Sequence, residues 1–389
     1  MQRVAVVITR FIAGAGGVAL RGALALDPTR YSVTILAAAG GPLLAEAEKA
    51  GFEVVRLRHM VPVVSLRTDP QALRELTGEL RNGRFDIVHT HSAKAGALGR
   101  IAAYRVGVPA IVHTFHGFPF HDFQLWPLRA AYIQIEKRLG RITDQFLAVG
   151  GAVAAQAINL RIAPAERIRT IASAIDLNIP PASPGNRAAA RRLMDLPDDA
   201  LVVGTVGRLA PQKAPQDMVA AIAAMDRANV YCVWVGDGPM REEVARLVER
   251  RNLGNRFLLL GERRDVAALL PGFDVFALSS HYEGLPCSLV EAMTCGLPVV
   301  ATAVNAVPEV VVPGRTGMLV PAAAPALLGR ALAYLLDHPS EGSRMAAAAR
   351  VQLGDRFDPE VLGRDLAETY EMALTSSTRT SSKSLRLVA

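Results

Sequence analysis

The chain has 389 residues, 51% apolar and 20% charged, which at roughly 150 residues per domain is enough for two domains with separate cores. No uninterrupted apolar run approaches the ~18 residues that a membrane-spanning helix needs, and Arg10 and Arg21 interrupt the apolar N-terminal stretch, so we expect neither a membrane span nor a signal peptide. Three irregularly spaced cysteines predict no disulfide framework and no zinc site, which favours a reduced, cytoplasmic protein.

Strands and helices alternate through the first half of the chain. Short β-branched runs predict strands at residues 4–8, 32–37, 53–57, 87–91, 110–114 and 146–149. Helices are expected after the GAGG sequence as far as Leu26, and at residues 42–51, 70–81, 93–107 and 153–158. Alternation of this kind indicates parallel strands covered by helices.

The alternation stops at residues 176–199, a Pro-, Ser- and Asn-rich stretch that we expect to be an interdomain linker. It then repeats, with strands predicted at residues 202–206, 230–235, 257–260, 275–278, 299–301 and 318–320. The helices between and after these strands are expected at residues 215–227, 241–251, 266–269, 288–295 and 326–337.

The two halves predict an α/β protein of two Rossmann-like, doubly wound domains that face a central cleft, with ligands at the carboxyl ends of the strands. The predicted domains are residues 1–178 and 179–358. A last helix at residues 359–374 is expected to cross back to the N-terminal domain. Residues 375–389 are rich in Ser, Thr and Lys, and we expect them to be disordered because they contain too few apolar side chains to offset the entropy of ordering.

The positive charge is concentrated in the first half. Residues 1–180 contain 21 Lys and Arg against 13 Asp and Glu, a net charge of +8, whereas the remaining residues contain 22 against 23, a net charge of −1. A surplus on one half favours an anionic partner for that half, such as a membrane surface or a phosphorylated acceptor. The alternative is a solvated basic surface without a partner.

Two cations follow the first predicted strand of the second half. Arg208 and Lys213 are five residues apart in the sequence GTVGRLAPQK, on the loop that leaves the carboxyl end of that strand. Such a pair can grip a diphosphate and stabilise the negative charge that develops when a sugar–oxygen bond breaks. Surface cations after strands are common, so the pair alone is also compatible with two solvent-exposed side chains.

A turn and a helix start lie in the sequence EGLPCSLVEAMTCGLPVVAT, residues 283–302. Gly284, Leu285 and Pro286 are expected to form a turn, whose glycine lets the backbone approach a ligand closely. Ser288 and Leu289 are expected to begin a helix, whose first N–H groups can bind a phosphate.

Two carboxylates eight positions apart flank that turn. Glu291 lies near the start of the predicted helix, where it can accept hydrogen bonds from both hydroxyls of a ribose. Glu283 precedes the turn and can accept hydrogen bonds from sugar hydroxyls. Together with Arg208 and Lys213, these residues predict a site for a sugar carried on a nucleotide diphosphate.

The E-x(7)-E spacing of Glu283 and Glu291, together with the basic pair, resembles the signature of the retaining glycosyltransferase family 4, and the resemblance extends to about Leu374. It implies the GT-B fold, a hexosyltransferase-type activity that retains the anomeric configuration of the donor, and no metal or other cofactor. The sequence HTHSAKAGALGR at residues 89–100 is similar to members that build bacterial exopolysaccharide or capsule. The expected donor is a UDP-sugar, and the expected acceptor is a glycan or a lipid-linked glycan.

The resemblance also implies roles for further residues. Gly16 and Gly17 match the Gly-Gly loop after the first strand, whose amides are expected to face the distal phosphate and the acceptor. His116 matches an acceptor-side histidine that is expected to hydrogen-bond the donor sugar. The nucleotide base is expected to lie against the loop from Arg263 to Val266. The catalytic set that this implies is His116, Arg208, Lys213 and Glu283.

Three alanines depart from the family pattern. Ala214 replaces a glycine after the basic lysine, Ala174 replaces the glycine of S-G-I-D, and Ala306 replaces a glycine in the loop before the last strand. A methyl group at each position can reshape a turn. Ala306 in particular puts in question the sugar or phosphate contact of its loop.

The histidines of the first half need separate consideration as metal ligands. His89 and His91 lie on one predicted strand, and we expect them on its opposite sides. His113 and His116 flank a strand end. Zinc needs a tetrahedral ligand set, which this arrangement does not provide, so core or sugar-contacting roles are expected.

Aromatic residues and cations occur together in residues 115–141 and bear on the acceptor. The aromatic residues are Phe115, Phe118, Phe120, Phe123 and Trp126, and the cations that follow are Arg129, Lys137, Arg138 and Arg141. Aromatics beside cations are typical of a segment on an anionic bilayer, which predicts peripheral association with the inner face of the cell membrane. The alternative is that these aromatics form the core around the acceptor pocket.

Other functions remain open. A soluble small-molecule acceptor is the second hypothesis, and a nucleotide-sugar epimerase of the GT-B fold is the third. An inactive scaffold is disfavoured by the cations and carboxylates. A dinucleotide dehydrogenase is disfavoured because the GAGG sequence lacks its third glycine and no acidic residue follows the second strand. No nucleic-acid partner is expected.

Overall fold

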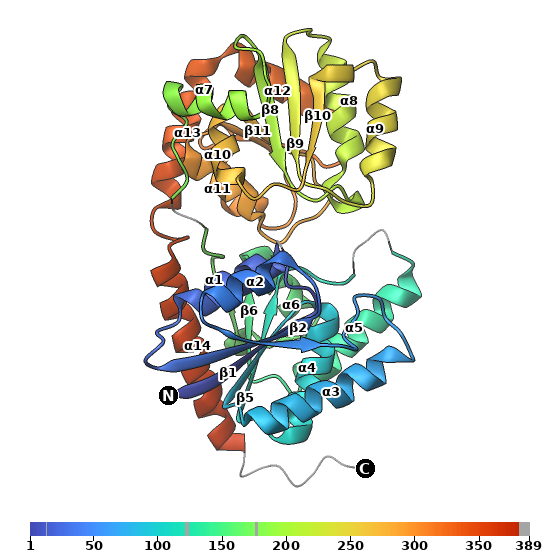
Figure 1. The fold of residues 1–389 in the computed structure, drawn as a ribbon, viewed down its shortest axis with the longest axis vertical. Coiled ribbons are helices and arrows are strands. Elements are labelled where there is room, and N and C mark those ends of the chain that lie inside the picture. Colours follow the sequence, from blue (N-terminus) through green and yellow to red (C-terminus); the bar gives the residue numbers. More distant parts are fainter. Residues whose placement is uncertain (13, 121–123, 176–177, 381–389) are drawn as a thin grey trace. The chain divides into compact units, whose positions relative to one another are not determined.

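The computed structural model describes residues 1–12, 14–120, 124–175 and 178–380. The chain divides into two compact units, which we call unit 1 and unit 2 (Figure 1). Unit 1 comprises Met1–Ala174 and the chain from Arg356 onward, and unit 2 comprises Ile175–Asp355. Within the described ranges, none of the helices combines the length and the apolar character that crossing a bilayer requires.

Unit 1 is built on a seven-stranded sheet in the order β3-β2-β1-β4-β5-β6-β7, and every pair is parallel. Its strands are β1 Gln2–Ile8, β2 Tyr31–Ala38, β3 Glu53–Leu57, β4 Ile87–His91, β5 Ala110–Phe115, β6 Gln145–Ala148 and β7 Ile168–Thr170. Its helices are α1 Ala15–Ala25, α2 Pro42–Lys49, α3 Thr68–Gly83, α4 Ala93–Val106, α5 Trp126–Gly140, α6 Gly151–Asn159 and α14 Pro359–Thr380.

Strand β1 shows why helices cover both faces of this sheet. Val4 and Val6 pack into one cluster with helices α1 and α14, whereas Ala5 and Val7 pack into another with helices α3 and α4. Successive side chains of a strand point to opposite faces, so a continuous apolar strand needs a cover on each face.

Helix α14 completes the core of unit 1. Leu362, Leu366, Tyr370 and Ala373 are buried in the same cluster as residues of β1 and α1, and α14 contacts α1, β5 and β6 (Figure 1). The helix continues through Thr375 to Thr380, so the start of the segment that was expected to be disordered is helical. The hydroxyl of Thr375 donates to the carbonyl of Glu371 at 2.9 Å within this extension. Residues 381–389 lie outside the described residues.

Unit 2 repeats the architecture with a six-stranded parallel sheet in the order β10-β9-β8-β11-β12-β13. Its strands are β8 Leu201–Val206, β9 Val230–Val235, β10 Phe257–Gly261, β11 Val275–Leu278, β12 Val299–Thr302 and β13 Met318–Val320. Its helices are α7 Pro184–Leu193, α8 Pro215–Met225, α9 Arg241–Arg250, α10 Val266–Leu269, α11 Cys287–Cys295, α12 Pro325–Asp337 and α13 Pro339–Leu353. The prediction of two doubly wound α/β domains is therefore confirmed.

The segment expected to be a linker, residues 176–199, contains helix α7 instead. Ser183 caps this helix by accepting a hydrogen bond from the backbone N–H of Asn186, and such caps satisfy orphan donors at helix starts. Arg187 and Arg191 of α7 both pair with Asp274 of unit 2. The polar composition that indicated a linker therefore reflects a capped surface helix, although Asp176 and Leu177 lie outside the described residues.

The strand orders determine where a ligand site can form. In each sheet the chain reverses direction across the sheet between two neighbouring strands, β1 and β4 in unit 1 and β8 and β11 in unit 2. In doubly wound folds, ligands bind at the carboxyl ends of the strands at this switch point. The residues that leave these four strands are therefore the first candidates for function.

Candidate active site

The switch point of unit 2 brings together residues from two separate sequence motifs. Gly207 and Arg208 follow β8, and a short 3-10 helix, Pro211–Lys213, completes that loop. Ser279 and Ser280 follow β11, directly before the turn that contains Glu283. Because β8 and β11 are neighbours, the loops that leave them meet at one edge of the sheet.

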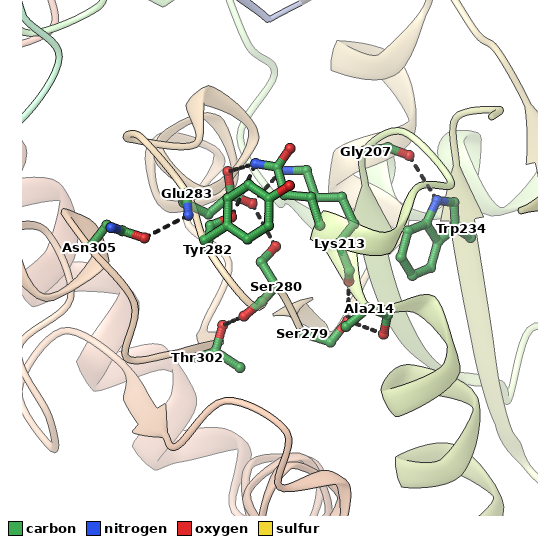
Figure 2. Close-up of polar contacts among 11 residues, drawn as sticks. Gly207, Lys213, Ala214, Trp234, Ser279, Ser280, Tyr282, Glu283, Thr302 and Asn305 are labelled. Carbon is green, nitrogen blue, oxygen red and sulfur yellow. Dashed lines mark hydrogen bonds and ion pairs between the residues drawn. The ribbon is translucent and has the colours of Figure 1, made fainter. Parts of the chain in front are cut away.

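Glu283 is the centre of this cluster. Its Oε1 accepts a hydrogen bond from Lys213 Nζ at 2.5 Å and another from the hydroxyl of Ser280 at 2.5 Å (Figure 2). Its Oε2 accepts from the amide of Gln212 at 3.3 Å, and its backbone N–H donates to the side-chain oxygen of Asn305 at 2.9 Å. The carboxylate is held at several points and its side chain is only 5% exposed.

The loop that carries Lys213 is fixed by its own contacts. The hydroxyl of Ser279 donates to the carbonyls of Lys213 and Ala214, at 2.8 and 3.1 Å. The indole N–H of Trp234 donates to the carbonyl of Gly207 at 2.8 Å. A Cβ atom at Gly207 would lie 3.2 Å from Lys213 Cε, so the absence of a side chain there leaves room for the lysine.

Arg208 lies in the same loop but is largely exposed. Burial raises the pKa of Tyr282, and the charge of Arg208 opposes that rise. The structure therefore gives the two predicted cations different surroundings. Lys213 is paired with Glu283, and Arg208 is exposed to solvent.

Helix α11 begins at Cys287, one residue before the predicted start. The N–H of Leu289 donates to the carbonyl of Pro286 at 3.1 Å, while the phosphate-binding role of Ser288 and Leu289 stays a prediction. The N–H is used because the chain makes a tight turn at the helix start. Glu291 is partly exposed within the second turn.

The predicted base-binding loop is held by an ion pair of its own. Arg263 donates to both carboxylate oxygens of Asp265, at 2.8 and 2.6 Å. Val266 begins helix α10. The charge of Arg263 is thus neutralised locally, while Arg264 of the same loop is exposed.

In unit 1, Gly16 and Gly17 are buried in the first turn of helix α1, and not in a loop. Gly14, with φ 78°, caps that helix. A Cβ atom at Gly16 would lie 3.2 Å from backbone atoms of Phe11, so the glycine permits close packing of the chain that leaves β1. The glycine pattern therefore reflects a helix start at the switch point.

His116 follows β5, and its Nε2 lies 2.9 Å from Nδ1 of His91. His91 stacks on His89, with ring centroids 4.2 Å apart. The expectation that His89 and His91 face opposite sides is wrong, because residues two apart on a strand share a face. Burial lowers the pKa of His116 to about 4 and that of His89 to about 3, so both rings are neutral at pH 7.

Several residues of this arrangement were not predicted as functional. Ser280 and Asn305 hold Glu283, and His91 contacts His116. The sequence feature that could have predicted Ser280 is the pair Ser279–Ser280 directly after a buried strand. Hydroxyls at the carboxyl end of such a strand lie at the edge of the sheet where ligands bind. Among the described residues, no three His, Cys, Asp or Glu side chains are grouped so that they could hold a metal ion.

Comparisons with known proteins cover both units. Residues 12–179 match the family described as Glycosyltransferase Family 4, and residues 186–352 match the family described as Glycosyl transferases group 1. The chain is 31% identical over 290 residues to the UDP-Gal:alpha-D-GlcNAc-diphosphoundecaprenol alpha-1,3-galactosyltransferase of Escherichia coli, a match that covers 72% of this chain and 73% of the relative. It is 32% identical over 332 residues to the D-inositol 3-phosphate glycosyltransferase of Thermobispora bispora, over 78% and 76% of the two chains.

A solved structure agrees with the fold. The complex of Anabaena HepE with UDP and glucose superposes with a TM-score of 0.84 at 22% identity, over 95% of this chain and 100% of that one. At this identity the likeness shows the fold alone.

Proposed function

The chain belongs to the family 4 glycosyltransferases of the GT-B fold, and we propose that it transfers a sugar, with retention, from a UDP-linked donor to a hydroxyl of a lipid-diphosphate-linked glycan. The observation that carries the proposal is the Lys213–Glu283 pair at the switch point of unit 2. It joins the two motifs that the donor site requires, a phosphate-binding cation and a carboxylate for sugar hydroxyls.

In the proposed donor complex, the diphosphate competes with Glu283 for Lys213. Arg208 and Lys213 then neutralise the diphosphate and stabilise it as the leaving group when the bond between the anomeric carbon and the phosphate oxygen breaks. Glu283 accepts hydrogen bonds from sugar hydroxyls, and Glu291 accepts them from the ribose. The backbone near Arg263 and Val266 lies against the base.

The surroundings of Glu283 support front-face transfer without a covalent sugar–enzyme bond. Oε1 accepts from Ser280 and Oε2 accepts from Gln212, contacts that do not depend on Lys213. Hydrogen bonds of this kind lower the nucleophilicity of a carboxylate. In the proposed reaction the acceptor hydroxyl attacks the face from which the diphosphate leaves. The leaving phosphate takes the hydroxyl proton, so no additional base is needed.

The names of relatives and of one solved complex support UDP as the donor nucleotide. The Escherichia coli relative is named for UDP-Gal, and the Anabaena structure contains UDP. The loop from Arg263 to Val266 does not by itself favour uracil over another base.

Exposed apolar side chains in unit 1 support a lipid-linked acceptor at the inner face of the cell membrane. Leu125 and Trp126, at the start of α5, are 80% and 79% exposed, and Leu128 is 49% exposed. An amphipathic segment with exposed aromatic residues and cations suits a bilayer interface. Phe115 and Phe120 are buried in the core of unit 1, so the aromatic run divides between core and surface.

Phe118 packs against that core, and Phe123 lies outside the described residues.

The Escherichia coli relative is named for a diphosphoundecaprenol-linked acceptor. A soluble acceptor is the second candidate, because the Thermobispora bispora relative is named for D-inositol 3-phosphate.

Nucleotide release measured with a panel of UDP-, GDP- and ADP-sugars, with a lipid-diphosphate-linked N-acetylglucosamine or D-inositol 3-phosphate as acceptor, tests the proposal. We expect turnover of a UDP-sugar with the lipid-linked acceptor. In the Arg208→Ala, Lys213→Ala double variant, transition-state stabilisation should fall by about 2–4 kcal/mol, together with UDP affinity measured by calorimetry. Arg246→Ala, which removes an exposed cation of helix α9, is the matched control. Unchanged UDP affinity in the double variant would refute the donor site.

A further inference from the structure

Hydrogen bonds and one ring contact connect helix α14 to His116. The hydroxyl of Tyr370 lies 2.8 Å from Nδ1 of His89, and Nε2 of His89 lies 2.7 Å from the hydroxyl of Thr114. His89 stacks on His91 at an interplanar angle of 36°, and Nδ1 of His91 lies 2.9 Å from Nε2 of His116. The contacts lie entirely within unit 1.

The members of this chain of contacts other than His116 are out of solvent, and His116 is half-buried. His89 is 3% exposed, His91 4%, Thr114 1% and Tyr370 1%. A buried polar group without a partner is costly, so buried networks in folded proteins are satisfied and define one arrangement. Both ring nitrogens of His89 have a partner here, which fixes the orientation of the ring on which His91 stacks.

The contact between two neutral imidazoles has a consequence for His116. Only one of the two nitrogens can carry the proton that lies between them, because one must donate and the other accept. The tautomers of His91 and His116 are therefore coupled. Whichever ring carries that proton determines whether Nδ1 of His116 donates or accepts. Nδ1 is the nitrogen that remains for a ligand.

Backbone strain lies next to these side chains. Ser92, the residue after His91, has φ 61° and ψ 163°, a region that is essentially restricted to glycine and costs about 1–3 kcal/mol. The hydroxyls of Thr9 and Ser92 lie 2.9 Å apart, and the N–H of Thr9 donates to Ser92 Oγ at 3.3 Å. These contacts join the ends of β1 and β4, the two strands of the switch point, and hold the strained turn in place.

We infer that His91, held by His89 and Tyr370, is a positioning residue that fixes the ring orientation and the tautomer of His116. The inference rests on the proposed function and on the family resemblance, which implies that His116 hydrogen-bonds the donor sugar. The inference extends the proposed site from the edge of the sheet of unit 1 to the hydroxyl of Tyr370 on helix α14. His91 and Tyr370 act through His116 and touch no substrate.

The first test is independent of turnover. Histidine side-chain ¹⁵N spectra of the free protein report the tautomer of each ring, and His116→Gln identifies the His116 signals. We expect His91→Leu to change the tautomer populations of His116. His91→Asn, whose amide can replace Nδ1, should restore the wild-type pattern. An unchanged His116 spectrum in His91→Leu would overturn the inference, whether or not the enzyme turns over a UDP-sugar.

The second test uses the UDP-sugar that the wild-type enzyme turns over. We expect His91→Leu to lower kcat at least tenfold with the KM for that donor unchanged within about twofold, and His91→Asn to recover most of kcat. A changed tautomer with an unaltered kcat would overturn the positioning role. A His91→Asn variant with a wild-type His116 spectrum but no recovered kcat would also overturn it.

A milder variant covers the case in which His91→Leu fails to fold. Tyr370→Phe removes only the hydroxyl and should lower kcat several-fold. Tyr31→Phe is the matched control, because Tyr31 packs edge-on against Tyr370 and its buried hydroxyl has no hydrogen-bond partner among the described residues. Equal kcat values for the two variants would exclude Tyr370 from the positioning chain.

Discussion

Lys213 Nζ and Glu283 Oε1 lie 2.5 Å apart although 70 positions separate the two residues. Their side chains are 16% and 5% exposed, so removing one partner leaves a charge that is shielded from water. We expect Lys213→Met to destabilise the protein by about 3 kcal/mol, and Glu283→Gln in the same chain to recover more than half of that loss. A double-mutant cycle of urea unfolding measures the coupling. Additive losses would show that the pair contributes no coupling energy.

The pH dependence of stability follows from the buried histidines of unit 1. Burial lowers the pKa of His89 to about 3 and that of His116 to about 4, and lowers the pKa of His91 and His113 as well. In the unfolded chain these groups titrate near 6.5. The unfolded state therefore binds more protons below pH 6.5, and stability falls as the pH falls towards 4.

We expect each of these histidines to contribute up to about 1.4 kcal/mol per pH unit in that window. Thermal unfolding from pH 7 to pH 4 measures the slope. His89→Gln should reduce it, whereas His338→Gln, at an exposed position, should not. A melting temperature that stays constant from pH 7 to pH 4 would contradict this account.

Ala214 shows what the departure from the family glycine does. Its φ is 45° and its ψ is 55°, and it is fully buried. The left-handed conformation costs an L-residue about 1–2 kcal/mol, while glycine adds entropy to the unfolded chain. We expect Ala214→Gly to stabilise the protein by about 0.5–1 kcal/mol in urea unfolding. Ala210→Gly, in the same loop but at φ −141°, should destabilise the protein. A loss of stability in both variants would contradict the claim that the backbone at Ala214 is strained.

Retention of configuration is expected because the attack and the departure occur on one face of the sugar. With a UDP-α-sugar donor, the new linkage should be α. The coupling constant of the anomeric proton in the product NMR spectrum measures this. A β product would end the front-face mechanism, and a glycosyl adduct on Glu283 would replace it with a two-step one.

Membrane association is expected to depend on the start of helix α5. The Leu125→Ser, Trp126→Ser double variant should lose binding to phosphatidylglycerol-containing vesicles in a flotation assay, because these two apolar side chains are exposed at the start of α5. Val351→Ser, an exposed position of unit 2, is the control. Wild-type binding should fall with added salt, which screens surface charges. No binding at low salt, with full activity on a soluble acceptor, would favour the soluble alternative.

Several strands could be predicted closely from the sequence. The structure reproduces the predicted bounds of Glu53–Leu57, Ile87–His91, Val230–Val235, Val275–Leu278 and Met318–Val320. The inner strands of a parallel sheet, such as Val230–Val235 and Val275–Leu278, are largely buried and form continuous apolar runs that turn residues delimit. Helices on the surface lack this signal. Helix α7 was interpreted as a linker, and helices α5 and α13 were not predicted.

The site residues could be predicted individually, but their contacts could not. The motifs indicated Lys213 and Glu283 as donor-binding residues, yet their pairing depends on β8 and β11 being neighbours, which no local pattern encodes. The stack of His89 on His91 was predictable from the two-residue period of a strand. The contact from Tyr370 was not, because the expected return of the last helix to the N-terminal domain does not indicate which side chains it meets there.

That packing also determines when unit 1 can be completed during synthesis. Unit 2 is continuous in sequence, so all of its residues are synthesised before helix α14. The earlier part of unit 1 must wait without Leu362, Leu366 and Tyr370, and its apolar surface beside α1 stays uncovered meanwhile. Domains generally fold as they emerge. Here the domain that begins first is finished last, and its exposed apolar surface during that interval is a natural target for chaperones.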